Sequence, residues 1–417
     1  MLTQKTILNF IAMVFLISTV GCSSDNGGGE PDPTPDPITS IDLNETELQM
    51  NVDDTEMLMV TTAIGESPVT WTSDDPQVVQ VDETGALTAM AGGTVQITVQ
   101  VEGVTAVCTI VVAPDVFVAG TEFNGTYNVA KYWKNGEVVL LSDGGSNAIA
   151  NSIFVNGPDV HVVGYESNPP SASYATYWLN GEETQLTDGS QYASAQAVFV
   201  YEDDVYIAGY ESNGTKLVAK YWKNGVPTIL SDGSKDEVPQ SIFVSENVVY
   251  VSGYEDDGAS RIAKYWVNGQ EILLANSTFS EARSIYVSGG DIYVAGVENI
   301  VGGFEAKYWL NGEEVVVSDG NSTDAGGEAI FVKGTDVYVS GYQLYSLAYV
   351  AKVWKNGTQT DLTDGTSFAR AESIYVFAAD IFVAGTGPTG ATYWINGEAQ
   401  LLTDGINGSD ATSIFVR

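Results

Sequence analysis

The sequence has 417 residues, of which 44% are hydrophobic, which is enough material for two or more packed domains. Its 54 acidic residues far outnumber its 16 basic ones, so the formal net charge is −38, and Lys and Arg form no run anywhere. A nucleic-acid site needs a basic stripe, so this composition argues against that class of partner. Two interpretations of the acidity stay open, namely cation binding and a solvated surface that favours solubility.

The N-terminal segment predicts export and membrane attachment. Lys5 precedes a hydrophobic stretch at residues 7–20, which is shorter than the roughly 20 residues of a membrane span and suits the core of a signal peptide. The run Thr19-Val20-Gly21-Cys22 resembles a bacterial lipobox, and this resemblance implies a lipoprotein signal peptide at residues 1–21 and diacylation of Cys22. Residues 22–37, rich in Gly, Pro and Asp, predict a tether. The alternative is an ordinary secretory signal with an incidental cysteine.

Residues 38–113 consist of short alternating segments separated by turn residues, a pattern typical of a β-sandwich. Cys108 falls in one alternating run and is expected to be buried without a disulfide partner. The phrase that runs from Trp71 through Val79-Gln80-Val81-Asp82 to Gly92 resembles the bacterial immunoglobulin-like domain of group 2. This resemblance implies that Trp71 belongs to the core and that the domain is a spacer or adhesion module without catalytic residues.

From Asp115 onward the chain repeats a unit marked by one tryptophan. The tryptophans are spaced by 45, 44, 44, 43, 45 and 40 residues, at Trp133, Trp178, Trp222, Trp266, Trp309, Trp354 and Trp394. Each unit holds four strand-like phrases, in the order SIFV, DVYVAG, AKYW and EVVLL. Four strands at this period predict the blade of a β-propeller, here over residues 114–417.

The ends of the repeat array predict a closed ring. The first unit lacks its SIFV phrase, and residues 413–417 supply a further copy after the last unit. An open solenoid would more often carry atypical capping repeats. We therefore predict an all-β chain in which a seven-bladed propeller, closed by its C-terminal strand, follows the immunoglobulin-like domain.

Every unit contains Asn-Gly directly after its tryptophan strand. Asn-Gly favours a type I′ turn, which predicts a tight hairpin between the third and fourth strands. The tryptophans are interpreted as blade packing, with sugar-stacking platforms as the alternative.

Two charged patterns also repeat. Lys131, Lys220, Lys264 and Lys307 lie two positions before the tryptophan in units that also carry Glu122, Glu211, Glu255 and Glu298, and Lys352 shares the lysine position. A cross-strand Lys–Glu pair accounts for this pattern. The Ser/Thr-Asp-Gly turns predict Asp side chains that cap a turn. Calcium binding is the alternative for their carboxylates, which belong to Asp143, Asp188, Asp232, Asp319, Asp364 and Asp404.

The candidate binding residues come from the crossovers that lead into each SIFV strand. One crossover position, directly before the strand, is polar in all seven units and differs almost every time. Its occupants are Asn151, Gln196, Gln240, Arg283, Glu328, Glu372 and Thr412. With SIFV innermost, these side chains would form a polar ring at the channel mouth, on the face of the variable loops. Nearby aromatic residues could add stacking surface, namely Tyr192, Phe279, Tyr345, Tyr349 and Phe368.

The sequence favours binding over catalysis. The single histidine, His161, stands where other units have Tyr or Phe and is interpreted as a packing residue. We expect no catalytic residue, no metal and no cofactor, and a monomer that binds a glycan or a protein partner. One alternative is a polysaccharide hydrolase or lyase that uses loop carboxylates such as Glu328 and Glu372. Another is a purely structural surface protein. Ser23 after Cys22 fits an outer-membrane lipoprotein that faces the periplasm or is exported to the cell surface.

Overall fold

The computed structural model describes residues 37–417 except 168–171, 276, 321 and 346–347. The expected signal peptide, the lipidation site at Cys22 and nearly all of the tether therefore lie outside the described residues. All the regular elements of the described part are strands, and none of its residues form a helix long and apolar enough to cross a bilayer.

The first domain is a β-sandwich whose two sheets enclose one apolar core. One sheet has the order β1 (Glu47–Asn51), β7 (Val104–Ala113), β6 (Gly93–Val101) and β3 (Val69–Ser73). The other has the order β2 (Thr55–Met57), β5 (Ala86–Ala89) and β4 (Val79–Val81). Cys108 is buried in this core as a free thiol, as expected. Trp71 packs against the core but stays partly exposed.

Seven four-stranded antiparallel sheets form the propeller, and each is one blade. Counted from the first blade, the innermost strands are β35 (Ser409–Val416), β11 (Asn147–Asn156), β15 (Ala193–Tyr201), β19 (Asp236–Ser245), β23 (Ser280–Ser288), β27 (Ala325–Lys333) and β31 (Arg370–Phe377). The second strands are β8 (Val116–Phe123), β12 (Asp159–Ser167), β16 (Asp204–Ser212), β20 (Val248–Asp256), β24 (Asp291–Ile300), β28 (Asp336–Tyr345) and β32 (Asp380–Gly387).

The two outer positions of each blade are joined by the Asn-Gly hairpins. The third strands are β9 (Asn128–Lys134), β13 (Ser173–Leu179), β17 (Leu217–Lys223), β21 (Arg261–Val267), β25 (Gly303–Leu310), β29 (Ala348–Lys355) and β33 (Gly390–Ile395). The outermost strands are β10 (Glu137–Leu140), β14 (Glu182–Gln185), β18 (Val226–Ile229), β22 (Gln270–Leu273), β26 (Glu313–Val316), β30 (Thr358–Asp361) and β34 (Glu398–Leu401).

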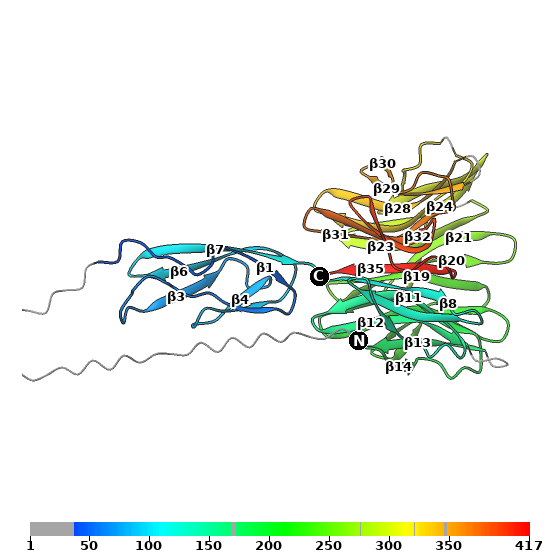
Figure 1. Cartoon of the computed structure of the whole chain (residues 1–417). Coiled ribbons are helices and arrows are strands. Elements are labelled where there is room, and N and C mark those ends of the chain that lie inside the picture. Colours follow the sequence, from blue (N-terminus) through cyan, green and yellow to red (C-terminus); the bar gives the residue numbers. More distant parts are fainter. Residues whose placement is uncertain (1–36, 168–171, 276, 321, 346–347) are drawn as a thin grey trace, which may run out of the picture.

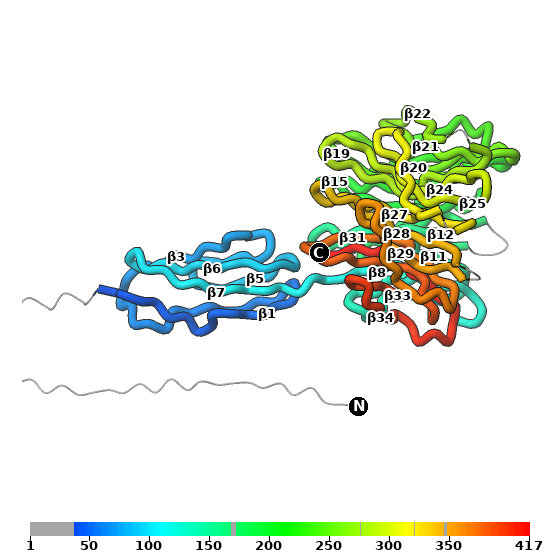
Figure 2. The backbone as a smooth tube through the Cα atoms, turned by 90° about the horizontal axis from the view of Figure 1, so that it is seen from above, coloured from blue at the N-terminus to red at the C-terminus, as the bar shows by residue number. Residues whose placement is uncertain are grey.

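The ring closes as predicted. Strand β35 pairs with β8 over Ser409–Val416, so the first blade contains both ends of the propeller. Figure 1 shows the immunoglobulin-like domain on the side of the propeller where β35 ends, and Figure 2 shows a short link from β7 to β8. Arg417 joins the two domains through its guanidinium, which lies 3.1 Å from the Asp53 carboxylate and 3.3 Å from that of Asp115. The opposite end of the propeller carries the loops between second and third strands.

The Asn-Gly hairpins have the geometry that the sequence predicts. The seven asparagines have φ between 48° and 53°, and the glycines that follow them are also at positive φ. The Asn135 side-chain oxygen accepts a hydrogen bond from the Val116 backbone N–H (2.8 Å), and its amide donates to Asp115 (2.7 Å). Equivalent bonds to the Asp that opens the second strand occur in five other blades. The Asp that opens each DVYVAG phrase in these six blades therefore holds the Asn-Gly hairpin in place through a hydrogen bond to the Asn side chain.

The tryptophans pack between blades. All seven side chains are at most 2% exposed, so the packing interpretation is confirmed. The four predicted Lys–Glu pairs form as well, with nitrogen–oxygen distances of 2.5, 2.6, 2.6 and 2.8 Å. In the sixth blade Gln343 replaces the glutamate, and Lys352 pairs instead with Asp361.

A β-bulge interrupts the innermost strand of every blade. The pairing with the second strand skips one residue at each of these positions. Just before the bulge, the carbonyl oxygen of Ile149 lies 1.8 Å from where a Cβ on Gly164 would stand. The sister glycines meet a carbonyl oxygen at 1.9–2.3 Å. Only glycine fits there, which explains the last letter of each DVYVAG phrase.

Candidate functional site

The seven candidate binding residues are the bulge residues of the innermost strands. The register shifts skip Asn151, Gln196, Gln240, Arg283, Glu328, Glu372 and Thr412. The expectation that they lie in crossover loops is wrong, because the innermost strands begin upstream of them, β11 for example at Asn147. A bulge re-aims a side chain and is frequent beside functional sites. The structure thus brings the seven residues onto one ring around the propeller axis, which we call the bulge ring.

One half of the bulge ring is charged. The Arg283 guanidinium lies 2.7 Å from Glu328 of the next blade and 2.8 Å from Glu281 of its own strand. Arg370 stands 3.9 Å from the same Glu328 carboxylate. Glu372 is partly buried beside these groups and forms no hydrogen bond or ion pair with any described residue. Burial, followed by the nearby Glu328 carboxylate, raises the pKa of Glu372 to about 8.

The other half of the bulge ring is neutral and links blades. The Asn151 amide donates to the Ala195 carbonyl of the next blade (2.8 Å), and the Thr412 hydroxyl donates to the Ala150 carbonyl (2.7 Å). The Gln196 amide donates to the Ser194 hydroxyl of its own strand (2.8 Å). Asn151 and Thr412 therefore stabilise the contact between the innermost strands of neighbouring blades.

Glu372 makes the stability of the propeller depend on pH. Its folded-state pKa of about 8 lies above the ordinary carboxyl value of 4.5, so the folded state holds a proton that the unfolded state has lost. The stabilisation from this group is therefore complete below pH 4.5 and is lost as the pH rises toward 8. Between pH 5 and 8, we expect Glu372→Gln to gain stability over the parent by up to about 1.4 kcal/mol per pH unit.

Thermal melting at several pH values checks this expectation. Glu398→Gln, a change on the exposed outermost strand β34 of the same blade, is the control. Parent and Glu372→Gln melting curves that keep a constant separation from pH 5 to pH 8 would contradict the assignment.

An aromatic ring narrows the channel next to the bulge ring. One aromatic side chain from each innermost strand touches those of both neighbouring blades, with centroids 4.7–5.1 Å apart. The members are Phe154, Phe199, Phe243, Tyr286, Phe331, Tyr375 and Phe415, all partly exposed. The sequence analysis missed this ring, although the Phe or Tyr of each SIFV phrase was its signal.

A cleft opens between the seventh and first blades, on the face of the variable loops. It has a volume of about 610 Å³ and reaches Thr412 of the bulge ring. The reason is a shortened hairpin: Val383 pairs with Trp394, only eleven positions on, whereas Val118 of the first blade pairs with Trp133, fifteen positions on. The spacing of 40 residues between Trp354 and Trp394, the shortest of the six, was the signal for this cleft in the sequence, but no cleft was predicted from it.

Most of the predicted stacking aromatics contact other side chains. The Arg370 guanidinium lies over the rings of Tyr342, Tyr349 and Phe368, at 4.1, 5.3 and 5.5 Å from their centroids. Phe279 lies under Arg261, and Tyr345 lies under Lys352. Tyr192 and Phe368 nevertheless stay 45% and 51% exposed, which leaves ring surface open to a ligand.

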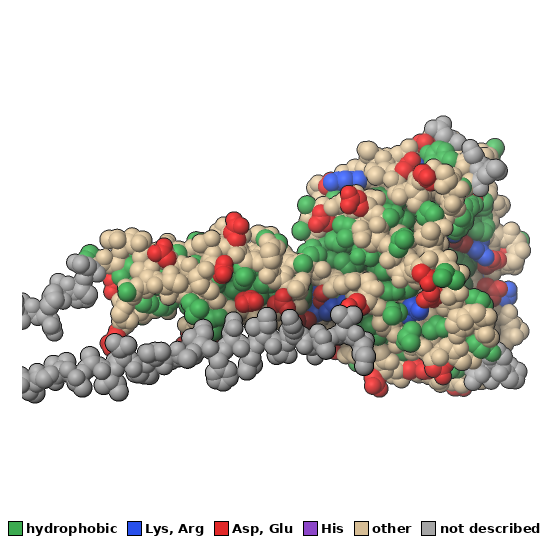
Figure 3. Space-filling model, viewed as in Figure 1, with side chains coloured by type: hydrophobic (Ala, Val, Ile, Leu, Met, Phe, Trp, Pro, Cys, Tyr) green, Lys and Arg blue, Asp and Glu red, His purple; other side chains and the backbone are tan. Residues whose placement is uncertain are grey.

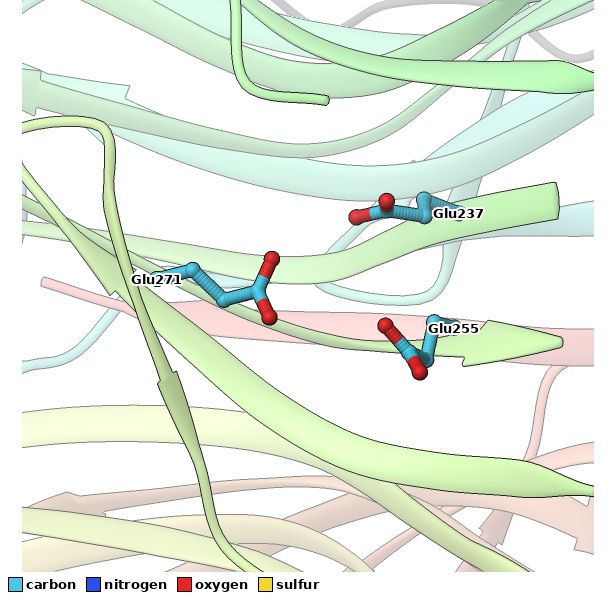
Figure 4. A group of neighbouring side chains, drawn as sticks. All are labelled: Glu237, Glu255 and Glu271. Atoms are coloured by element: carbon cyan, nitrogen blue, oxygen red, sulfur yellow. The ribbon is translucent and has the colours of Figure 1, made fainter. Parts of the chain in front are cut away.

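Three carboxylates in the fourth blade come close enough together to suggest a metal site. Figure 4 shows Glu237, Glu255 and Glu271 converging from β19, β20 and β22, with carboxylate oxygens within 4.8 Å of one another. The buried ammonium of Lys264 lies 3.2, 2.6 and 3.0 Å from them, in that order. Burial opposes this charge, but hydrogen bonds to Glu255 and Glu271 raise the pKa of Lys264. The group is therefore accounted for as an ion-pair cluster in which one buried ammonium lies between three carboxyl groups.

The Asp residues considered for calcium binding act mainly as turn caps. In five turns the Asp carboxylate accepts a hydrogen bond from the backbone N–H two residues on, at 2.7–3.0 Å. In the sixth, Asp319 accepts from the side-chain amide of Gln343 at 2.5 Å. His161 is buried against the Tyr177 hydroxyl (2.7 Å), as expected of a packing residue, and burial lowers its pKa.

Comparison with known proteins agrees with this architecture. Residues 37–112 match the family model of the bacterial Ig-like domain (group 2), so the chain is a bacterial immunoglobulin-like domain followed by a seven-bladed propeller. No curated protein sequence matches the chain.

Three solved structures illustrate the fold-level likeness. The β-propeller domain of the Trilobed protease from Pyrococcus furiosus is 10% identical, with 88% of this chain and 97% of that chain covered and a TM-score of 0.41. TolB from Acinetobacter baumannii is 7% identical (70% and 78% covered, TM-score 0.41). A puromycin-hydrolyzing peptidase from Mycobacterium tuberculosis is 10% identical (67% and 50% covered, TM-score 0.47), so this chain spans about half the length of that peptidase. Likeness at this level concerns the fold alone and carries no activity to this chain.

Proposed function

We propose that this chain is a lipid-anchored cell-envelope protein whose propeller binds a glycan or a protein partner without catalysing a reaction. The bulge ring is the observation that carries the proposal. The hairpins, tryptophans and glycines repeat in every blade because packing dictates them, whereas the seven bulge residues are of five different types. Variation on a rigid scaffold is what recognition requires.

The arrangement of the domains supports presentation of this site. Figure 1 places the immunoglobulin-like domain beside the end of β35, and the variable loops lie at the other end of the propeller. An anchor at Cys22 would therefore hold the binding face away from the membrane. Figure 3 shows acidic side chains scattered over the visible side of both domains, and the net charge of −38 disfavours strongly anionic partners.

A thermal-shift panel on the exported chain carrying Cys22→Ser tests the proposal. The panel contains neutral, anionic and amino-sugar polysaccharides, basic and acidic peptides, and calcium against a chelator. A ligand present at 100 times its Kd should stabilise the native state by about 2.7 kcal/mol. A shift with any glycan or peptide supports recognition. A flat panel would overturn it and favour a purely structural role.

A second candidate function has one observation in its favour. Arg283 neutralises Glu328, while the raised pKa of Glu372 keeps its carboxyl protonated at neutral pH. A carboxyl group with a raised pKa next to one that is ion-paired with arginine resembles the acid and nucleophile of a glycosidase. Turnover of a polysaccharide by the parent protein, lost in Glu372→Gln while binding is retained, would establish this function in place of simple recognition.

A further inference from the structure

The cleft between the seventh and first blades is the strongest break in the sevenfold repetition of the propeller. In the other blades the second-strand residue that pairs with the tryptophan lies fifteen or sixteen positions before it, whereas in the seventh blade it lies eleven positions before it. The Gly387–Gly390 turn of the seventh blade ends early, so the neighbouring surfaces of β8, β9 and β35 are left uncovered. Its volume of about 610 Å³ falls within the range of small-molecule sites, about 300–1,000 Å³.

The apolar lining of the cleft is exposed rather than packed. Phe123, Phe368 and Ile406 line it and are 39%, 51% and 81% exposed, although large apolar side chains are usually covered. An aromatic face attracts the weakly positive C–H groups on one side of a sugar ring. The aromatic walls therefore offer stacking surfaces of the size of a pyranose.

The polar lining consists of hydroxyl and amide groups. Thr121, Asn128, Thr389 and Asn407 line the cleft. Asp410 is the one charged side chain among the lining residues, and it accepts a hydrogen bond from the Thr386 hydroxyl at 2.7 Å. Neutral donors and acceptors of this kind match the hydroxyl groups of a sugar.

The charge of the site selects against other ligands. A basic peptide would need several free carboxylates, whereas the cleft has one and that one is already hydrogen-bonded. An anionic sugar would approach a chain of net charge −38 without any Lys or Arg in the cleft to bind it. A neutral ligand meets neither obstacle.

We propose that this cleft binds a short neutral oligosaccharide, with Phe123 and Phe368 stacking on sugar rings and Thr412 joining the cleft to the bulge ring. This assignment rests on the proposed recognition function and gives it a ligand class and a position. The shortened hairpin that opens the cleft occurs in the seventh blade and in none of the other six, so the cleft offers one site per molecule.

The chain provides a matched pair of variants for the test. Phe368 and Ile229 are large apolar side chains that are 51% and 66% exposed. Only Phe368 lines the cleft. Isothermal titration of the Cys22→Ser chain with neutral hexasaccharides of glucose, mannose, galactose and xylose identifies a binder. We expect Phe368→Ala to weaken that binder roughly tenfold or more, and Ile229→Ala, a change on the exposed outermost strand β18 of the third blade, to leave its Kd unchanged.

A second cleft variant is needed in case Phe368→Ala weakens binding by disturbing the fold. Asn407→Ala removes an exposed amide from the cleft and is expected to weaken binding several-fold while the melting temperature stays constant. A hexasaccharide that binds equally to the parent and both cleft variants would overturn the cleft as the site, and recognition by the propeller would stand. Binding of peptides or anionic glycans alone would overturn the neutral-sugar assignment. A protein that binds none of these probes would remove both proposals.

Discussion

Removal of residues 413–417 is expected to abolish cooperative folding of the propeller. This truncation deletes Ile414 and Val416, which are 4% and 1% exposed, together with Phe415 of the aromatic ring. Loss of a buried aliphatic side chain costs about 2–5 kcal/mol and loss of a Phe about 3–5 kcal/mol. The sum is comparable to the whole stability of a domain, about 5–15 kcal/mol. Scanning calorimetry should therefore lose the transition of the propeller.

Two controls separate strand closure from the contact between domains. Arg417→Ala removes the ion pairs with Asp53 and Asp115 but keeps β35 and the backbone hydrogen bonds between residue 417 and Asp115, so a melting curve close to that of the parent is expected. A synthetic peptide of residues 409–417, added to the truncated chain, should restore the transition by pairing with β8. An unchanged melting curve after the five-residue truncation would refute the closure of the ring by β35.

Gly164→Ala is expected to destabilise the second blade by about 3 kcal/mol. The new methyl group would stand 1.8 Å from the Ile149 carbonyl oxygen, and a backbone oxygen in a paired strand has little freedom to move. The bulge at Asn151 would have to shift, together with its hydrogen bond to Ala195. For a domain of about 300 residues the change corresponds to a fall in Tm of roughly 5 °C.

The matched control for this variant is Gly408→Ala. Gly408 is exposed, its φ is not positive, and no atom lies within 4 Å of an added Cβ. The melting temperature of Gly408→Ala in calorimetry and its midpoint in chemical denaturation should both equal those of the parent. If Gly164→Ala melted like Gly408→Ala, the bulge would be adaptable and its role in positioning Asn151 would fail.

The periodicity of the sequence predicted those structural features that recur in every blade because each blade packs in the same way. The Asn-Gly hairpins, the buried tryptophans, the Lys–Glu pairs and the closing strand each leave a mark in nearly every unit. The sequence analysis placed the bulge residues correctly in register but took them for loop residues. A bulge adds one residue to a strand, and alternation alone does not distinguish that residue from the start of the strand.

The cleft and the aromatic ring depend on contacts between blades. Phe154 and Phe415 are separated by most of the propeller sequence but have centroids 4.8 Å apart, because closure brings their strands together. The cleft combines a short turn at Gly387–Gly390 with uncovered side chains of the first blade. Neither can be read from one repeat, since each arises only when neighbouring blades pack against each other.

The place where the chain enters the propeller has a mechanical consequence. Strand β8 is not an edge strand: it is paired with β35 on one side and with β9 on the other. A pull on the immunoglobulin-like domain acts along β8, at right angles to the hydrogen bonds of both neighbours, so both rows of bonds share the load in shear instead of opening one at a time. Tension delivered through the spacer thus meets the first blade in its most resistant direction, and the strand that closes the ring also bears the force.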